Sequence, residues 1–282
     1  MKVLLTGGRG MLGRTLCNEL TDFEVIPTDL PEVDITCLDS LDAAMQKFRP
    51  DAVIHCAAMT DVDKCETEPV LAYCLNRYGS ENTAKICNKY QIRLIAISTD
   101  YVFDGDSDKP YSETDPANGG NTVYGKSKFL GEEAVRKYCP DSVVARISWL
   151  YGAGGPSFVH TMMKLADGTH SELKVVADQI GNPTSTLSVA RKLREILNRP
   201  ELTGTFHLTS EGEASWFEFA CEIFRIANIS QRVVPCTTDE FPRPAPRPKN
   251  SCLEKAMLRK YNLSPMPHWR DSLQEFMSKE FL

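Results

Sequence analysis

Short apolar runs alternate with amphipathic stretches along the first half of the chain. The runs with the length and character of buried strands are 2–6, 23–27, 52–56, 93–98 and 142–147. The stretches between them that predict helices are 14–20, 41–48, 69–90 and 124–138. Because strands alternate with helices, we expect an α/β fold built on a doubly wound parallel sheet, with ligands bound at the carboxyl ends of its strands.

The pattern is looser beyond residue 150. Helices are expected at 158–165, 188–197, 216–227 and 269–280, and a proline-rich loop at 241–250. Two further apolar runs, 173–177 and 204–208, read as strands that either rejoin the first sheet or belong to a second one. We therefore expect one domain over 1–149 and a smaller α/β domain over most of 150–282.

Composition is that of a globular protein, because 42% of the 282 residues are hydrophobic and 25% are charged. The formal net charge of -6 and the lack of a basic run argue against nucleic-acid binding. No stretch approaches the roughly 18 apolar residues of a membrane span, and the apolar start is too short for a signal peptide. We therefore expect a cytoplasmic protein with no membrane partner.

Cysteine and histidine are not clustered. The 10 cysteines include no C-x-x-C pair, and the 5 histidines are scattered. These spacings predict free thiols and no metal site. His55, at the end of an apolar run, is expected to be structural.

A glycine-rich turn, G-x-x-G-x-x-G over residues 7–13, directly follows the first predicted strand and opens a helix. Glycines at such a turn let the backbone approach a pyrophosphate, which the free N–H groups of the helix then hold. A glycine-rich turn without a ligand is the alternative. The position of the motif favours a dinucleotide cofactor and makes 1–149 the dinucleotide-binding domain.

An acidic residue, Asp29, ends the second predicted strand some twenty residues beyond the glycines. A carboxylate there can bind the ribose hydroxyls of adenosine and favours NADH. Arg9 and Arg14 are close enough in sequence to accept a 2′-phosphate, so the choice between NADPH and NADH stays open. Asp34 and Ile35 either flank the adenine or lie in a solvated loop.

Tyr124 and Lys128 lie four residues apart in a predicted helix, so both side chains leave the same face. A free tyrosine has a pKa of about 10, and a neighbouring ammonium is expected to lower that pKa. The pair can then transfer a proton to or from a carbonyl or hydroxyl oxygen. Because Y-x-x-x-K is common by chance, the surrounding motifs decide whether this pair is functional.

Those motifs carry a family resemblance. The glycine-rich turn together with Y-x-x-x-K resembles the extended short-chain dehydrogenase/reductases, which have a Rossmann-type sheet. Narrower motifs resemble the dTDP-4-dehydrorhamnose reductase family, in order and register from residue 1 to about 255. They are AAxTxVDxCE at 57–66, STDYVFDG at 98–105, YGKSKxxGE at 124–132, RxSWLYG at 146–152, DQxGxPT at 178–184 and APRPKNSxL at 245–253.

The resemblance implies that NADPH or NADH reduces the C4 keto group of dTDP-4-dehydro-L-rhamnose to give dTDP-L-rhamnose. Tyr124 would protonate the C4 oxygen, and Lys128 would hold the nicotinamide ribose. Thr99 would bind the same oxygen as Tyr124. Asp100 would contact the sugar, and Trp149 would form one wall of its pocket.

The same resemblance assigns residues to the cofactor and to the rest of the substrate. The cofactor-binding set is Gly7, Gly10, Met11, Leu12, Gly13, Asp29, Asp34, Ile35, Ala58, Met59, Thr60, Tyr124 and Lys128. Val62, Asp63 and Lys64 would reach the substrate. Arg247, between two prolines, either holds the substrate diphosphate or is a solvated loop arginine.

Two other functions fit the same motifs. One is an epimerase, dehydratase or reductase of the same fold that acts on another nucleotide sugar. The other is a non-catalytic NADP-binding regulatory subunit, like the beta subunit of methionine adenosyltransferase. The intact Thr99, Tyr124 and Lys128 favour catalysis. The sequence leaves open whether the protein is a homodimer.

Overall fold

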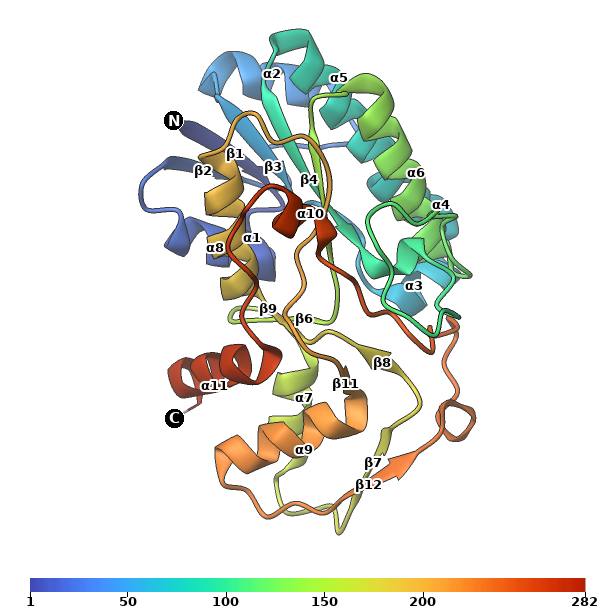
Figure 1. The fold of residues 1–282 in the computed structure, drawn as a ribbon. Coiled ribbons are helices and arrows are strands. Elements are labelled where there is room, and N and C mark those ends of the chain that lie inside the picture. Colours follow the sequence, from blue (N-terminus) through green and yellow to red (C-terminus); the bar gives the residue numbers. More distant parts are fainter. Residues whose placement is uncertain (282) are drawn as a thin grey trace.

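The computed structural model describes residues 1–281 and has a six-stranded parallel sheet at its centre (Figure 1). The strand order is β10-β5-β4-β3-β1-β2, with all neighbours parallel. The chain adds β2 on one side of β1 and then adds β3 and the later strands on the other side, so the direction in which strands are added reverses between β1 and β3. The six strands are β1 (Lys2–Thr6), β2 (Glu24–Thr28), β3 (Ala52–His55), β4 (Arg93–Thr99), β5 (Val143–Ile147) and β10 (Gly204–His207). The expected doubly wound fold is confirmed, and the reversal marks where such sheets bind ligands.

Helices cover both faces of the sheet, which is why its central strands β1, β3, β4 and β5 are largely apolar and buried. Val3 and Leu5 of β1 face one layer, whereas Leu4 between them faces the other. The first layer contains α1 (Met11–Glu19), α8 (Thr186–Leu197) and α10 (Ala256–Lys260). The second contains α2 (Leu38–Phe48), α5 (Ser80–Tyr90) and α6 (Val123–Tyr138).

The helix expected over 69–90 is divided. It consists of α4 (Pro69–Tyr73), a π-helical turn η1 (Cys74–Gly79) and α5, and a short helix α3 (Val62–Thr67) that we did not expect precedes it. Within the π-helical turn, the Asn76 side chain accepts a hydrogen bond from Met59 N at 2.8 Å and donates one to Met59 O at 3.0 Å. The wider turn thus ties this helix to the segment that follows β3.

A second unit lies at the carboxyl-terminal side of the sheet (Figure 1). Helices α7 (Phe158–Leu165), α9 (Trp216–Ala227) and α11 (Trp269–Glu280) surround an aromatic core that includes Tyr151, Phe219 and Trp269. Strand β7 (Leu173–Val176) pairs in parallel with β12 (Val233–Cys236) in a two-stranded sheet of its own. The expectation that residues 173–177 extend the main sheet is therefore wrong, whereas residues 204–207 do lie at its edge.

Shorter elements complete the described chain. They are the strands β6 (Leu150–Tyr151), β8 (Ile180–Gly181), β9 (Thr184–Ser185) and β11 (Ala214–Ser215) and the 3-10 turns η2 (Asp100–Val102) and η3 (Thr238–Glu240). Because the chain crosses between the two units several times, the division at residue 149 stays a prediction. In the part of the chain that the structure describes, no helix is both long and apolar enough to cross a membrane.

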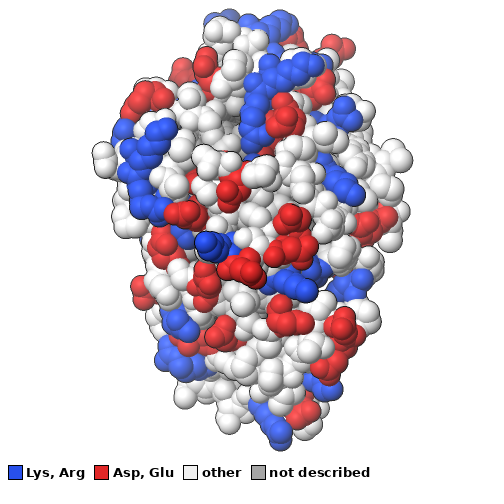
Figure 2. All heavy atoms as spheres, turned by 45° about the vertical axis from the view of Figure 1, so that its right-hand side comes forward, with Lys and Arg blue, Asp and Glu red and all other residues white. Residues whose placement is uncertain are grey.

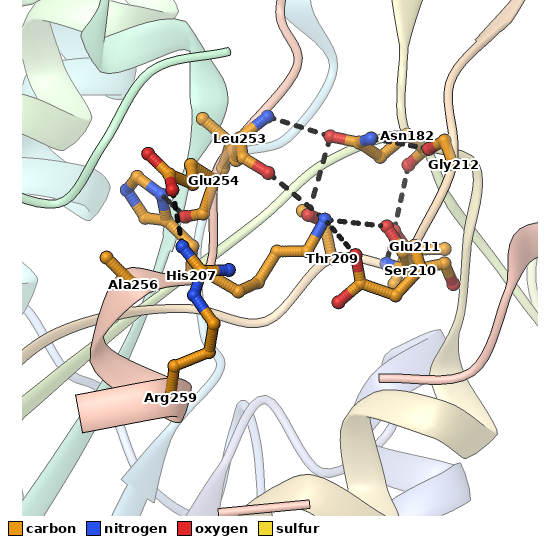
Figure 3. A network of polar contacts seen from close by, with 12 residues as sticks. Asn182, His207, Thr209, Ser210, Glu211, Gly212, Leu253, Glu254, Ala256 and Arg259 are labelled. Carbon is orange, nitrogen blue, oxygen red and sulfur yellow. Dashed lines mark hydrogen bonds and ion pairs between the residues drawn. The ribbon is translucent and has the colours of Figure 1, made fainter. Parts of the chain in front are cut away.

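A polar network joins the loop after β10 to the segment before α10 (Figure 3). The buried Lys255 Nζ donates to Ser210 O and Leu253 O, each at 3.1 Å, and pairs with Glu211 at 3.3 Å. Asn182 accepts from Leu253 N at 2.8 Å and donates to Gly212 O at 2.7 Å. These contacts fix the far end of the segment that carries the proline-rich loop.

Candidate active site

The glycine-rich turn packs tightly against neighbouring backbone, which leaves no room for side chains at two of its glycines. Gly7 has a φ of +69°, and a Cβ there would lie 2.7 Å from Ala57 N. A Cβ on Gly13 would lie 2.4 Å from Gly7 O. Gly10 is the N-cap of α1 and supplies no side-chain cap, so the first N–H groups of this helix are left for a ligand.

A cleft of about 590 Å³ runs from this turn along the carboxyl ends of the strands. Most of the predicted site residues line it: Gly7, Gly10, Met11, Leu12, Gly13, Asp29, Asp34, Ile35, Ala58, Thr60, Val62, Thr99, Asp100, Tyr124 and Trp149. Met59 and Lys128 are buried and do not line the cleft, and neither do Asp63, Lys64 and Arg247. Asp34 and Ile35 thus lie at the cleft rather than in a solvated loop.

Tyr124 lies in the first turn of α6, whose N-cap Thr122 accepts a hydrogen bond from Gly125 N at 2.9 Å. Its ring packs edge-on against Tyr101, with centroids 5.5 Å apart. Burial raises the pKa of Tyr124 above its usual value, while the hydroxyl of Thr99 acts in the opposite direction. Lys128 was expected to lower the pKa of Tyr124. That expectation is not met, because desolvation of the buried phenol outweighs the effects of the neighbouring groups. The phenol therefore stays protonated at neutral pH, as a proton donor must.

Lys128 lies one turn further along α6 and beneath the cleft. Its Nζ donates a hydrogen bond to Ile97 O of β4 at 2.7 Å. Burial lowers the pKa of Lys128 to about 8, with a partial offset from Glu132. The side chain therefore still carries a positive charge at neutral pH.

Thr99 is the last residue of β4 and Asp100 the first of η2, and both are buried. The Thr99 hydroxyl donates to Asp100 Oδ1 at 2.9 Å. Burial raises the pKa of Asp100 to about 6. Asp100 is among the residues that line the cleft, whereas its Oδ2 atom is buried without a hydrogen-bond partner among the described residues.

Trp149 forms the wall between the two units. Its indole stacks on Trp216 of α9, with centroids 3.5 Å apart and an interplanar angle of 1°. The same indole covers Gly181, where a Cβ would come within 2.4 Å of the ring. The sequence pattern predicted Trp216 only as the start of an amphipathic helix and not as a partner of Trp149. It did not predict the contact between Tyr101 and Tyr124.

Asp63 and Arg247, both predicted to reach the substrate, are paired with each other. The guanidinium donates to both carboxylate oxygens of Asp63 at 2.9 Å, and Ala245 N donates to the same group at 3.1 Å. Arg247 also lines two hollows of about 340 and 240 Å³ in the second unit, together with Phe241 and Arg243. Their roles in substrate binding stay predictions, as does that of Lys64, which pairs with Glu68 at 3.7 Å.

A buried ion pair holds the catalytic helix to the sheet. Arg146 of β5 donates to Glu132 of α6 at 2.9 and 2.8 Å. Although burial alone would raise the pKa of Glu132, the Arg146 guanidinium lowers it to about 2. The expected structural role of His55 is confirmed, because its ring contacts the hydroxyls of Thr6 at 2.7 Å and Ser80 at 3.2 Å.

The model of the RmlD substrate binding domain family matches residues 1–281. This chain belongs to that family. A dTDP-4-dehydrorhamnose reductase from Streptomyces griseus is 40% identical to this family member over 96% of this chain and 91% of its own length.

Two solved structures extend the likeness of this family member to three dimensions. A dTDP-4-dehydrorhamnose reductase from Clostridium acetobutylicum has a TM-score of 0.96 and 43% identity over 100% of both chains. A second, from Bacillus anthracis, was solved in complex with NADP and has a TM-score of 0.95 and 38% identity over 99% of both chains.

Proposed function

We propose that this chain reduces the C4 keto group of dTDP-4-dehydro-L-rhamnose to give dTDP-L-rhamnose, with NADPH or NADH as the hydride donor. The observation that carries the proposal is the cleft that brings Tyr124, Thr99 and Asp100 onto the same surface as the glycine-rich turn. The names of the family members above support a reductase over an epimerase or dehydratase of the same fold.

The residues of the turn fit a dinucleotide. Close backbone contacts at Gly7 and Gly13 leave no room for side chains, and the uncapped N-terminus of α1 supplies N–H groups for a pyrophosphate. Gly10, Met11 and Leu12 would hold that group, with Asp29 at the adenosine end. When bound, the nicotinamide supplies the hydride.

The side chains at the other end of the cleft handle the proton. The Tyr124 phenol gives its proton to the alkoxide that develops at C4. The positively charged Lys128, one turn away, would hold the nicotinamide ribose. Thr99 would turn its single hydroxyl proton from Asp100 to the sugar oxygen, so that the oxygen is held in place during the transfer.

The nucleotide half of the substrate fits the hollows of the second unit. The larger hollow is lined by aromatic side chains, including Phe158, Trp216 and Phe241, against which a thymine base can stack. Arg247 lies at both hollows and would bind the diphosphate. In doing so it would exchange its bond with Asp63 for one with the substrate.

The test is the absorbance at 340 nm when the purified protein is mixed with NADPH or NADH and dTDP-4-dehydro-L-rhamnose. A loss of absorbance that requires the sugar is expected. Tyr124→Phe should lower kcat by about 100-fold or more, because it removes the proton donor, and should leave NADPH binding unchanged. A stable absorbance with tight cofactor binding would contradict the proposal and favour the non-catalytic alternative.

A further inference from the structure

A second hollow lies next to the cofactor cleft at its adenosine end. Its volume is about 560 Å³, and it is lined by Gly8, Arg9, Arg14, Cys17, Asn18, Pro27, Thr28, Asp29 and Glu32. Asp29 lines both the cleft and this hollow. A group attached to the adenosine ribose and extending past Asp29 would therefore enter a space with two arginines and one glutamate.

The arginine nearest the strand end is already engaged. The Arg9 guanidinium donates to Glu32 Oε1 at 2.6 Å and to Leu30 O at 2.8 Å. Both charged side chains are solvent-exposed, 60% for Arg9 and 55% for Glu32. An exposed ion pair contributes little to stability, so a stronger anion can displace the glutamate.

Asp29 does not take part in this exchange. Its carboxylate accepts hydrogen bonds from Arg9 N at 3.1 Å and Leu30 N at 3.0 Å, which fix it at the end of β2. It is held in the same way whatever the Arg9 side chain binds. The group that can change partners is Glu32.

We propose that Glu32 sets the choice between NADPH and NADH by competing with the 2′-phosphate for the guanidinium of Arg9. The inference rests on the cofactor class of the proposed function and deepens it. With NADH, the Arg9–Glu32 pair stays intact. With NADPH, the 2′-phosphate takes the guanidinium, and the displaced carboxylate is left beside a second anion. The chain therefore accepts both cofactors, and Glu32 removes part of the advantage that Arg9 would give to NADPH.

Binding without the sugar tests this directly. The nicotinamide fluorescence of NADPH and of NADH gives a Kd for each with the wild type and with Glu32→Gln. The substitution should tighten NADPH by about three- to tenfold, since the carboxylate no longer competes, and should leave NADH unchanged. Glu24→Gln is the matched control, because Glu24, on β2, is in an exposed pair with Lys2 at 3.7 Å and lies outside the hollow.

A second variant keeps the inference open to refutation. Arg9→Gln should weaken NADPH by about tenfold and spare NADH, and in the double variant the gain from Glu32→Gln should disappear. Equal tightening of both cofactors by Glu32→Gln would overturn the proposal, because it would show general charge repulsion. An unchanged ratio of the two Kd values would overturn it as well.

Small probes separate this inference from the proposed reaction. Adenosine 2′,5′-bisphosphate and 5′-AMP differ in the 2′-phosphate and carry no nicotinamide. Glu32→Gln should strengthen displacement of NADH by the bisphosphate and not by 5′-AMP, and no such difference would refute the role of Glu32. This readout does not depend on turnover, so a failure of the reductase assay would leave it standing.

Discussion

Two bidentate ion pairs of the molecule differ in burial. Glu132–Arg146, between α6 and β5, has side chains that are 2% and 3% exposed. Asp63–Arg247 at the second unit has side chains that are 24% and 20% exposed. The first pair can change only if the protein unfolds, whereas the second can exchange partners with a ligand.

The difference matches what each pair has to do. The proposed proton transfer needs Tyr124 and Lys128 at fixed positions, and the buried Glu132–Arg146 pair holds α6, which carries both, against β5. Nucleotide binding and release need contacts that form and break. Figure 2 shows that basic and acidic side chains are interspersed over one face of the molecule.

The largest effect is expected for Glu132→Gln. It leaves the buried Arg146 without its carboxylate and should lower the free energy of unfolding by about 3 to 5 kcal/mol in urea titrations. Glu133→Gln is the control, because Glu133 pairs with Arg136 at the surface and is 55% exposed. A similarly small loss for both variants would mean that the buried pair does not anchor α6.

The same pair predicts how the wild type responds to acid. The pKa of Glu132 is about 2 in the folded protein against a usual value of 4.5. Its stabilisation is therefore present above pH 4.5 and is lost as the pH falls towards 2. Glu132→Gln should lack this part of the acid dependence.

A smaller effect, of opposite sign, is expected for Lys128→Met. The pKa of Lys128 falls from 10.5 to about 8 on folding, so the unfolded chain binds more protons between these values and stability rises with pH there. The variant lacks this titration. As the pH rises from 7 to 10, its free energy of unfolding should therefore fall by about 2 to 3 kcal/mol relative to that of the wild type. It should also weaken NADPH binding and lose turnover. A parallel pH dependence of the two proteins would show that Lys128 is not desolvated.

Arg247→Ala comes next in size. Removing a charge-assisted contact to the diphosphate should raise the KM for the nucleotide sugar by about tenfold, with the Kd for NADPH unchanged. The free energy of unfolding should fall by less than about 1 kcal/mol, since the pair with Asp63 is half-open to solvent. An unchanged KM would mean that Arg247 holds the proline-rich loop in place and does not contact the diphosphate.

Local patterns predicted the parts of the molecule that depend on neighbours in sequence. The apolar runs located all six strands of the main sheet, and the glycine-rich turn fixed the cofactor end of the cleft. The pairing of 173–176 with 233–236 was missed, because a four-residue strand carries no information about its partner.

The electrostatics of the site depended on tertiary structure in the same way. The four-residue spacing placed Tyr124 and Lys128 on one helix but could not give their burial, which raises one pKa and lowers the other. Asp63 and Arg247 are 184 residues apart, so their pairing was not visible in either motif.

The smallest effect is expected for Asp63→Asn. It tests most directly whether the Asp63–Arg247 pair exchanges partners with a ligand. The Arg247 guanidinium and Ala245 N hold the pKa of Asp63 below its usual value despite the opposing effect of burial, so the carboxylate is charged at neutral pH. The substitution removes the charge that competes with the diphosphate, and dTDP should bind about two- to threefold more tightly by calorimetry. Binding that becomes several-fold weaker would instead show that Asp63 contacts the nucleotide or positions Arg247 for it, and the pair would then be as fixed as Glu132–Arg146.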